Sequence, residues 1–294
     1  IAPLDFDMAA DVHRYIKSKR IKLYLNNGVK AIDGNTVILQ NGTIDAEMII
    51  MSVGVRPETS LAKDCGIEVN RRGSIVVDRH MKTNIQNIYA VGDAVEAEDF
   101  ITKSPAFIPL AGPANKQGRI AADNICGINS EYTGTQGSAV LKLFDMTVAT
   151  TGINEKSASA AGIDYDKTYI YSGSHASYYP SASNMSIKAL WDKKTLKIIG
   201  AQIVGFDGVD KRMDVLASSI RFGAKITDLA NLELCYAPPF GSAKDPVNML
   251  GFVAENIITG KMKQFFWNDV EKLPRDGSVT LLDVRTVTEV KRGR

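Results

Sequence analysis

A glycine-aspartate pair that follows a short apolar run is the most informative candidate site in the sequence. Residues 83–94 read TNIQNIYAVGDA, and the run at 88–91 predicts a strand that stops at Gly92 and presents Asp93 at its carboxyl end. In open α/β sheets, ligands bind outside the carboxyl ends of the strands. A glycine lets the backbone approach the ligand, and a carboxylate accepts hydrogen bonds from sugar-type hydroxyls. The pattern therefore indicates a site for a hydroxyl-bearing ligand, with a buried strand and a turn as the alternative.

A helix with a small, apolar face follows this candidate site. Residues 108–124 read IPLAGPANKQGRIAADN, in which Pro113 suits a first helical turn and a helix is predicted from Ala114 to Ile125. The amino end of a helix carries unpaired N–H groups and a partial positive charge, so it attracts negative charge. We expect this end to face the ligand, although a helix that only packs against its neighbours would have the same pattern.

The run T-x4-I-Y-A-x-G-D-A resembles the second FAD-binding motif of the pyridine nucleotide–disulfide oxidoreductases. The resemblance implies that Asp93 binds a ribitol hydroxyl of the flavin. It also implies that the amino end of the helix points at the N1–O2 edge of the isoalloxazine and stabilises negative charge on the reduced flavin. The residues expected to contact FAD are Val91, Gly92, Asp93, Ala94, Leu110, Ala111, Gly112 and Gly54.

Two tyrosine-containing clusters form a second candidate site, HASYYP at 175–180 and CYAPPFGSAKDP at 235–246. By residue type alone these tyrosines suit interface packing, since tyrosine buries well and keeps a polar tip. The runs YYP and YAPPFGSAKDPVN also resemble the CoA-disulfide reductases, including versions fused to a rhodanese domain. That resemblance implies that Tyr178, rather than Tyr179, and Tyr236 are catalytic and reach across a homodimer to the partner's flavin and active-site cysteine. Their hydroxyls would donate a hydrogen bond to a thiolate or a proton to a leaving sulfur.

Two lysines are candidates for binding the anionic CoA part of a substrate. Lys116 lies in the first turn of the predicted flavin helix, and Lys244 directly precedes a helix start at Asp245-Pro246. Lysine at the amino end of a helix is unfavourable for the helix dipole. A phosphate contact would explain these positions, and two solvated side chains are the alternative.

The family resemblance divides the chain into four segments with α/β and α+β folds. Residues 1–53 resemble the second half of an NAD(P)H-binding domain and 54–135 the second half of an FAD-binding domain, both Rossmann-like. Residues 136–262 resemble the α+β dimerisation domain of the same family. Residues 263–294 contain LLDVR-T-x-x-E, which resembles the opening strand and helix of a rhodanese domain. Because about 30 residues cannot bury a core alone, we expect this last segment to be a linker and a truncated domain.

The hydrophobic pattern predicts the elements of the first two segments. A helix is expected from Asp5 to about Lys19, with an apolar face of Met8, Ala9, Val12 and Ile16. Strands are expected at 21–25 and 29–32, and Asn41-Gly42 gives a tight-hairpin signature between 36–40 and 43–46. Apolar runs at 47–53 and 73–78 predict two more strands, the first of them buried.

The third segment shows strands followed by a helical run, which is typical of an α+β domain. The predicted strands are 139–144, 147–152, 168–171, 186–192 and 198–204, and the predicted helices are 154–161, 209–222, 226–232 and 245–258.

Two features of a complete reductase of this type are absent from the sequence. No G-x-G-x-x-G occurs, although such turns let a dinucleotide pyrophosphate approach a helix amino end. The family's redox cysteine is also absent. Cys65, Cys126 and Cys235 have no C-x-x-C or metal-ligand spacing, and we expect them to be buried reduced thiols. We therefore expect the chain to be the carboxyl-terminal part of a larger protein whose redox cysteine lies elsewhere.

The bulk composition bears on which classes of partner the protein could have. The 294 residues are 45% hydrophobic and 23% charged with a formal net charge of +2, which gives no reason to expect a nucleic-acid or membrane-surface partner. No apolar run approaches the ~18–20 residues of a membrane span. The family resemblance, rather than the composition, implies a cytoplasmic homodimer that uses FAD and NAD(P)H, without a metal, to reduce a CoA disulfide or persulfide. The alternatives are an NADH oxidase or peroxidase of the same fold, and a non-catalytic dimerisation module that binds FAD weakly on its own.

Overall fold

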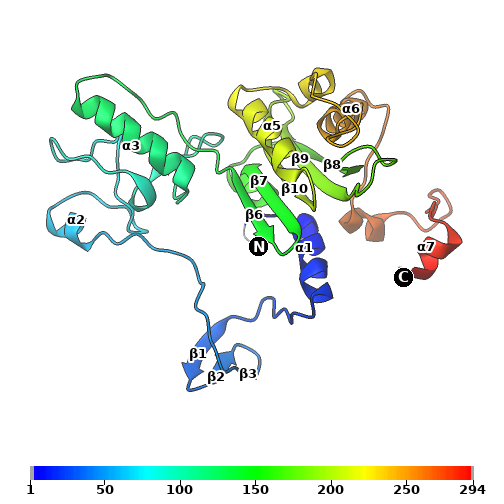
Figure 1. Cartoon of the computed structure of the whole chain (residues 1–294), viewed down its shortest axis with the longest axis horizontal. Coiled ribbons are helices and arrows are strands. Elements are labelled where there is room, and N and C mark those ends of the chain that lie inside the picture. Colours follow the sequence, from blue (N-terminus) through cyan, green and yellow to red (C-terminus); the bar gives the residue numbers. More distant parts are fainter. Residues whose placement is uncertain (1–2, 293–294) are drawn as a thin grey trace. The chain divides into compact units, whose positions relative to one another are not determined.

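The computed structural model describes residues 3–292, with the side chain of Arg292 outside that description (Figure 1). Two compact units divide the chain, Ile1–Ala254 and Glu255–Arg294. The first unit contains a five-stranded sheet with its helices, a three-stranded hairpin sheet and a largely irregular segment around one long helix. The mixture of α/β and α+β elements agrees with the predicted fold class.

The five-stranded sheet is antiparallel and lies in the middle of the first unit's core. Its strands are β6 (Ala139–Leu143), β7 (Met146–Gly152), β8 (Tyr165–Gly173), β9 (Asn184–Asp192) and β10 (Ile198–Gly205), in the order β6-β7-β10-β9-β8. Every residue of the central strand β10 is buried. All five strands were predicted from the sequence and are confirmed, with β8 longer than expected.

The predicted helices of this domain are also present. They are α4 (Glu155–Ala160), α5 (Val209–Arg221), the short 3-10 helix η2 (Ile226–Asn231) and α6 (Pro246–Ile258). Helix α5 packs on β7 and β10, with Met213, Leu216 and Ile220 buried. The alternation of apolar residues in the strands and the apolar stripe of α5 therefore account for the α+β arrangement.

Helix α1 (Phe6–Ser18) begins after Asp5 and packs on the same sheet. Its buried residues Met8, Ala9 and Val12 share a core cluster with Met146, Val148 and Val204 of β7 and β10. Ile16 packs against this cluster from the edge. The predicted helix and its apolar face are confirmed.

The hairpin predicted around Asn41-Gly42 is confirmed, whereas two neighbouring strands are not. Strands β1 (Val29–Asp33), β2 (Thr36–Leu39) and β3 (Thr43–Asp45) pair in sequence order, and Gly42 has a φ of 93°, which suits glycine in the turn. The predictions of a strand at 21–25 and of a buried strand at 47–53 are wrong. A buried strand needs partners on both sides, and among the described residues none pairs with either run. The run at 47–53 is instead exposed at Met48, Ile50, Met51 and Val53.

The segment 54–135 has little regular sheet. It contains α2 (Ser60–Asp64), the 3-10 helix η1 (Gly92–Ala94), the short strands β4 (Ala97–Glu98) and β5 (Pro105–Ala106), and α3 (Ala111–Ile125). The strands predicted at 73–78 and 88–91 are wrong as strands, because only isolated bridges form: Ile75 with Val69 and Val95, and Tyr89 with Lys82. Helix α3 confirms the predicted helix and packs through Ala121 against Met81 and Tyr132.

The described part of the second unit begins with the last turn of α6 and contains two further short helical elements, η3 (Trp267–Lys272) and α7 (Val287–Arg292). The strand expected at 280–284 is wrong; Leu282 and Val284 are exposed, and no described residue pairs with this run. The helix start after it is confirmed. The Thr286 hydroxyl accepts a bond from the Glu289 backbone, and the Glu289 carboxylate accepts one from the Thr286 N–H at 2.8 Å, which is a capping box.

None of the helices among residues 3–292 has both the length and the apolar character that a membrane span requires.

Candidate functional site

The structure brings the Gly92-Asp93 turn and the amino-terminal half of α3 together. The Gly92 N–H donates a hydrogen bond of 2.8 Å to Oε1 of Gln117, a side chain that is 2% exposed. Gly92 has a φ of 80°, a conformation that glycine adopts without strain. Sequence reasoning did not identify Gln117, although a glutamine one turn before Ala121, on the inner face of the predicted helix, was a usable signal. The buried amide fixes the turn that carries Asp93.

The polar groups of this turn and helix end remain available to a ligand. The Asp93 side chain is exposed and has no hydrogen bond to a residue between 3 and 292. Helix α3 has Leu110 at its amino cap without a side-chain cap bond, and Ala111 and Gly112 in the first turn are exposed. An exposed carboxylate acceptor beside helix N–H donors fits a ligand such as a flavin, which carries both hydroxyls and an oxygen that gains negative charge.

The other residues predicted to contact FAD lie partly beside the Gly92-Asp93 turn and partly elsewhere in the chain. Val91 and Ala94 flank the Gly92-Asp93 pair directly, with Val91 exposed and Ala94 partly buried. Gly54 is exposed and has a φ of 100°, in a run without regular structure. The contact role of Gly54 stays a prediction.

The two predicted substrate lysines are both exposed, and neither has an ion-pair partner in the part of the chain that the structure describes. Lys116 lines an open cavity of about 580 Å³ with Gly112, Pro113 and the facing side of α5. Lys244 directly precedes Asp245, the residue that opens α6. The structure thus leaves both ammonium groups available for an anion.

The structure places the hydroxyls of Tyr178 and Tyr236 3.3 Å apart, within hydrogen-bond distance, although 58 residues separate them in the chain. Tyr178 is 75% exposed and Tyr236 49% exposed. The hydrogen bond with Tyr236, followed by a smaller effect of desolvation, raises the pKa of Tyr178. Tyr179 instead packs edge-on against the ring of His175, with ring centroids 5.9 Å apart. Of the two neighbouring tyrosines, Tyr178 is therefore the one that pairs with Tyr236.

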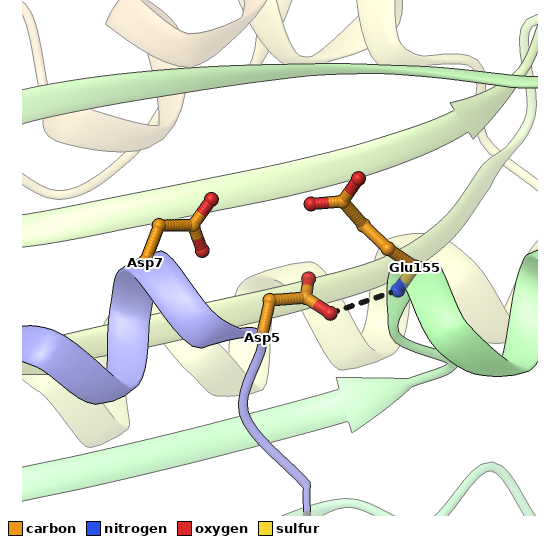
Figure 2. Close-up of side chains that lie close together, drawn as sticks. All are labelled: Asp5, Asp7 and Glu155. Carbon is orange, nitrogen blue, oxygen red and sulfur yellow. Dashed lines mark hydrogen bonds between the residues drawn. The ribbon is translucent and has the colours of Figure 1, made fainter. Parts of the chain in front are cut away.

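A third group of polar residues lies between α1, α4 and the sheet (Figure 2). Figure 2 shows the carboxylates of Asp5, Asp7 and Glu155 turned toward one another, with the Glu155 N–H donating to Asp5 Oδ1 at 3.0 Å. Their ligand oxygens lie within 4.8 Å of one another, a spacing that could hold a metal ion. The completely buried Lys188 of β9 supplies a positive charge here: its Nζ is 2.8 Å from Asp5 Oδ2 and 3.1 Å from Asp7 Oδ1, and it also pairs with Glu155.

The ionised forms of this network stabilise each other. Burial alone would lower the pKa of Lys188, but its hydrogen bonds to Asp5 and Glu155 outweigh burial and raise it. Burial alone would raise the pKa of Asp7, but the bonds from Tyr169 and Lys188 outweigh it and lower the pKa. The pKa of Glu155 is lowered in the same way by Lys167 and Lys188. The network therefore ties α1 to the sheet, and sequence reasoning missed it because its members are up to 183 residues apart.

The three cysteines differ from the prediction. Cys65, Cys126 and Cys235 are free thiols, and all are exposed rather than buried. Each lies at or beyond the end of a helix or in an irregular loop, where no sheet covers it. The expectation of buried thiols is therefore wrong.

Comparisons with known proteins agree with this architecture. Residues 2–121 match the family model described as pyridine nucleotide-disulphide oxidoreductase, and residues 138–246 match that family's dimerisation domain. Coenzyme A disulfide reductases of Staphylococcus aureus (strain bovine RF122 / ET3-1) and Staphylococcus epidermidis (strain ATCC 12228 / FDA PCI 1200) are each 33% identical to this chain over 254 residues, or 86% of the chain. The match covers 58% of each relative, so the chain spans less than two thirds of their length.

Solved structures give the same result. The crystal structure of reduced Bacillus anthracis CoADR-RHD is 46% identical with a TM-score of 0.94, and the match covers 99% of this chain and 53% of that one. An NAD-dependent persulfide reductase from A. fulgidus is 34% identical with a TM-score of 0.88, over 92% of this chain and 51% of that one. A water-forming NADH oxidase from Lactobacillus brevis, at 24% identity and a TM-score of 0.81 over 88% of this chain and 58% of that one, shares the fold.

Proposed function

Because the chain belongs to the pyridine nucleotide-disulphide oxidoreductase family, we propose that it is part of an FAD- and NAD(P)H-dependent reductase of CoA disulfide or CoA persulfide. The observation that carries the proposal is the pair of exposed tyrosine hydroxyls 3.3 Å apart. Two relatives at 33% and 34% identity are named as a coenzyme A disulfide reductase and a persulfide reductase, which supports this substrate class.

Asp93 and the amino end of α3 are the groups that would hold FAD. The exposed Asp93 carboxylate would accept a hydrogen bond from a flavin hydroxyl, and Gln117 keeps the Gly92-Asp93 turn in place. The N–H groups of Ala111 and Gly112 would stabilise negative charge at the edge of the flavin ring. FAD, when bound, supplies the electron transfer between the nicotinamide and a thiol.

The tyrosine pair would assist the cleavage of a sulfur–sulfur bond. A thiolate attacks one sulfur, the S–S bond breaks, and the departing sulfur carries the negative charge as a thiolate. Tyr178 or Tyr236 would donate a hydrogen bond or a proton to this sulfur. A tyrosine hydroxyl of ordinary pKa, about 10, already keeps its proton at neutral pH, and the hydrogen bond with Tyr236 raises the pKa of Tyr178 further. The attacking cysteine, in this proposal, lies outside these residues.

Several finer features belong to the same proposal. The exposed Lys116 and Lys244 would bind CoA phosphates, and NAD(P)H would be the electron donor. The match of residues 138–246 to a dimerisation domain supports a homodimer in which each tyrosine pair serves the partner's flavin. Three free, exposed thiols suit a reducing compartment, which supports a cytoplasmic location. Residues 263–294 would form a linker and the start of a rhodanese-like domain; the LLDVR-T-x-x-E run with its capped helix start supports this.

Steady-state assays of the whole protein test the proposal. NAD(P)H oxidation would be followed with CoA disulfide, CoA persulfide or oxygen as the acceptor. We expect turnover with a CoA acceptor, and a loss of about 10²-fold or more in Tyr178→Phe and Tyr236→Phe, the lower range for general acid catalysis. Tyr171→Phe is the matched control, because Tyr171 is equally exposed but lies on β8 away from the pair.

The alternative chemistry has its own outcome in these assays. An NADH oxidase or peroxidase would use oxygen or peroxide through a cysteine sulfenic acid. Turnover of oxygen alone, with both phenylalanine variants as active as wild type, would identify that enzyme and refute disulfide reduction.

A further inference from the structure

A buried arginine connects the two loops that carry the paired tyrosines. Arg212 of α5 is 1% exposed, and its Nη2 donates to the carbonyl oxygen of Ser174 at 2.7 Å and to that of Phe240 at 3.5 Å. Ser174 lies four residues before Tyr178, and Phe240 lies four residues after Tyr236. One guanidinium group therefore bonds to both loops. In each loop the bonded carbonyl is four residues from the tyrosine.

The charge of Arg212 is compensated at the start of α6. Nη2 donates to Asp245 Oδ2 at 2.8 Å and Nε to Oδ1 at 3.4 Å, and Asp245 is also buried. Asp245 Oδ1 in turn accepts the Val247 N–H at 3.0 Å, so this carboxylate also caps α6. A buried ion pair contributes little net stability compared with an apolar pair of the same shape, but it requires a defined arrangement of its partners.

The backbone around Arg212 is shaped to admit the guanidinium. Nη1 donates to the Gly208 carbonyl at 3.2 Å. Gly208 has a φ of 66°, and a Cβ at this position would lie 2.1 Å from Nη1. Glycine at 208 is therefore needed both for the left-handed turn and for the space that Arg212 occupies.

Further bonds constrain the backbone of the tyrosine loops, while Tyr178 and Tyr236 themselves are exposed. The Ala176 N–H donates to the Gly241 carbonyl at 2.9 Å, which joins the loops directly. Nε2 of the buried His175 lies 3.0 Å from the Pro180 carbonyl, and since a carbonyl only accepts, this nitrogen carries a proton. Because Tyr178 is 75% and Tyr236 49% exposed, ring packing constrains them only in part, and the backbone bonds of the two loops contribute to where their hydroxyls lie.

We propose that Arg212 is a positioning residue that holds the Tyr178 and Tyr236 hydroxyls in contact by fixing the two loops to one another. It touches neither hydroxyl and acts through the Ser174 and Phe240 carbonyls. Its effect on turnover rests on the proposed reductase function. Its effect on the hydroxyl pair does not.

Arg212→Lys tests the proposal, because lysine keeps the positive charge beside Asp245 but lacks the planar group in which Nε and Nη2 bind Asp245 and so hold Nη2 against the Ser174 and Phe240 carbonyls. A second variant, Arg212→Met with Asp245→Asn, removes both charges and so leaves no unpaired buried ion. Lys211→Met is the matched control: Lys211 is the partly buried neighbour whose Nζ bonds to the Phe240 carbonyl at 3.3 Å, with no bond to the other loop among the described residues.

The first measurement is independent of catalysis. The protein would be labelled with ¹³Cζ-tyrosine, and the Tyr178 resonance would be assigned by its loss in Tyr178→Phe and followed through an alkaline titration. In Arg212→Lys and in the double variant we expect the Tyr178 midpoint to fall toward the value it has in Tyr236→Phe, because the hydroxyl contact that raises its pKa is lost. Lys211→Met should keep the wild-type midpoint.

The second measurement is turnover of CoA disulfide by the whole protein. A displacement of about 1 Å at a reacting group lowers rates by about 10²-fold, so we expect kcat to fall by about 10- to 100-fold in Arg212→Lys with KM nearly unchanged.

A wild-type Tyr178 midpoint in both Arg212 variants would overturn the inference, whatever their melting temperatures, since that result assigns Arg212 a role in stability alone. If Arg212→Lys does not fold, the Tyr178 midpoint of the double variant tests the inference instead. A shifted Tyr178 midpoint in the Arg212 variants, together with a wild-type protein that does not reduce CoA disulfide, would refute the proposed function and leave the positioning role intact. Full activity in Arg212→Lys beside an inactive Tyr178→Phe would refute the positioning role alone.

Discussion

Replacing the buried lysine between α1 and the sheet should destabilise the first unit strongly near neutral pH. Lys188→Met keeps the length of the side chain and removes the ammonium that pairs with Asp5, Asp7 and Glu155. Figure 2 shows these three carboxylates. The three carboxylates then face one another with only Lys167 left to pair with Glu155. The change therefore leaves uncompensated negative charge at the amino end of α1.

The expected magnitude follows from the burial of the network. Removing one partner of a buried ion pair costs about 3–5 kcal/mol. Lys188 is completely buried, but Asp7 and Glu155 keep some contact with water, so we expect the lower end, about 3 kcal/mol. Lys193→Met is the matched control. It removes an exposed pair with Asp164 at 3.0 Å, and exposed pairs contribute little.

The pH dependence of this effect has a defined sign. The pKa values of Asp7 and Glu155 are lowered from 3.8 and 4.5, so their contribution to stability is present above those values and is lost as the pH falls through the lowered ones. The pKa of Lys188 is raised from 10.5, so its contribution is complete below 10.5 and is lost as the pH rises further. The difference between wild type and Lys188→Met should therefore be largest between these limits and shrink in acid.

Urea denaturation at pH 7 and at pH 3, followed by far-UV circular dichroism, measures the free energy of unfolding of both proteins. A difference below about 1 kcal/mol at pH 7, the range of surface ion pairs, would show that the network is not buried as described. An equal difference at both pH values would refute the assignment of the stabilisation to ionised carboxylates.

Three further changes test other parts of the structure. Asp93→Asn should weaken FAD binding about tenfold or more, because a hydrogen bond to a charged group contributes about 1.5–3 kcal/mol. A flavin fluorescence titration measures the affinity for FAD, and an unchanged affinity would show that Asp93 does not bind the flavin. Gln117→Leu leaves the Gly92 N–H without its acceptor, so FAD affinity should also fall while the helix content of the protein stays the same in circular dichroism. Gly152→Ala should destabilise the sheet by about 2 kcal/mol or more, because Gly152 has a φ of 69° and a Cβ would lie 2.2 Å from the Ile199 carbonyl; a wild-type melting temperature would contradict that geometry.

The sequence predicted the dimerisation-type sheet well because its strands carry local signals. Alternating or continuous apolar runs at β7, β9 and β10, and the apolar stripes of α1 and α5, are patterns of neighbouring residues. The run at 47–53 is about as apolar as β10, yet it is exposed at Met48, Ile50, Met51 and Val53. A strand exists only where another strand pairs with it, and no local pattern contains that partner.

The candidate site residues show the same difference between local sequence signals and contacts that form only in the folded protein. Tyr178 and Tyr236 were found because each lies in a recognisable motif, and the structure brings their hydroxyls together. Arg212 and Lys188 were not found, because each acts through residues distant in the chain that become neighbours only in the folded protein. The cysteines were misjudged because burial depends on which elements cover a loop.

A double-mutant cycle on the tyrosine pair tests the central claim most directly. The measured quantity is kcat/KM for CoA disulfide with NAD(P)H in the whole protein, for Tyr178→Phe, Tyr236→Phe and the double variant. We predict that the double variant loses about as much as either single variant, because two hydroxyls joined by one hydrogen bond, in which one donates and the other accepts, act as a unit. Losses that multiply, or single variants as active as wild type, would contradict the claim that this pair performs the disulfide chemistry.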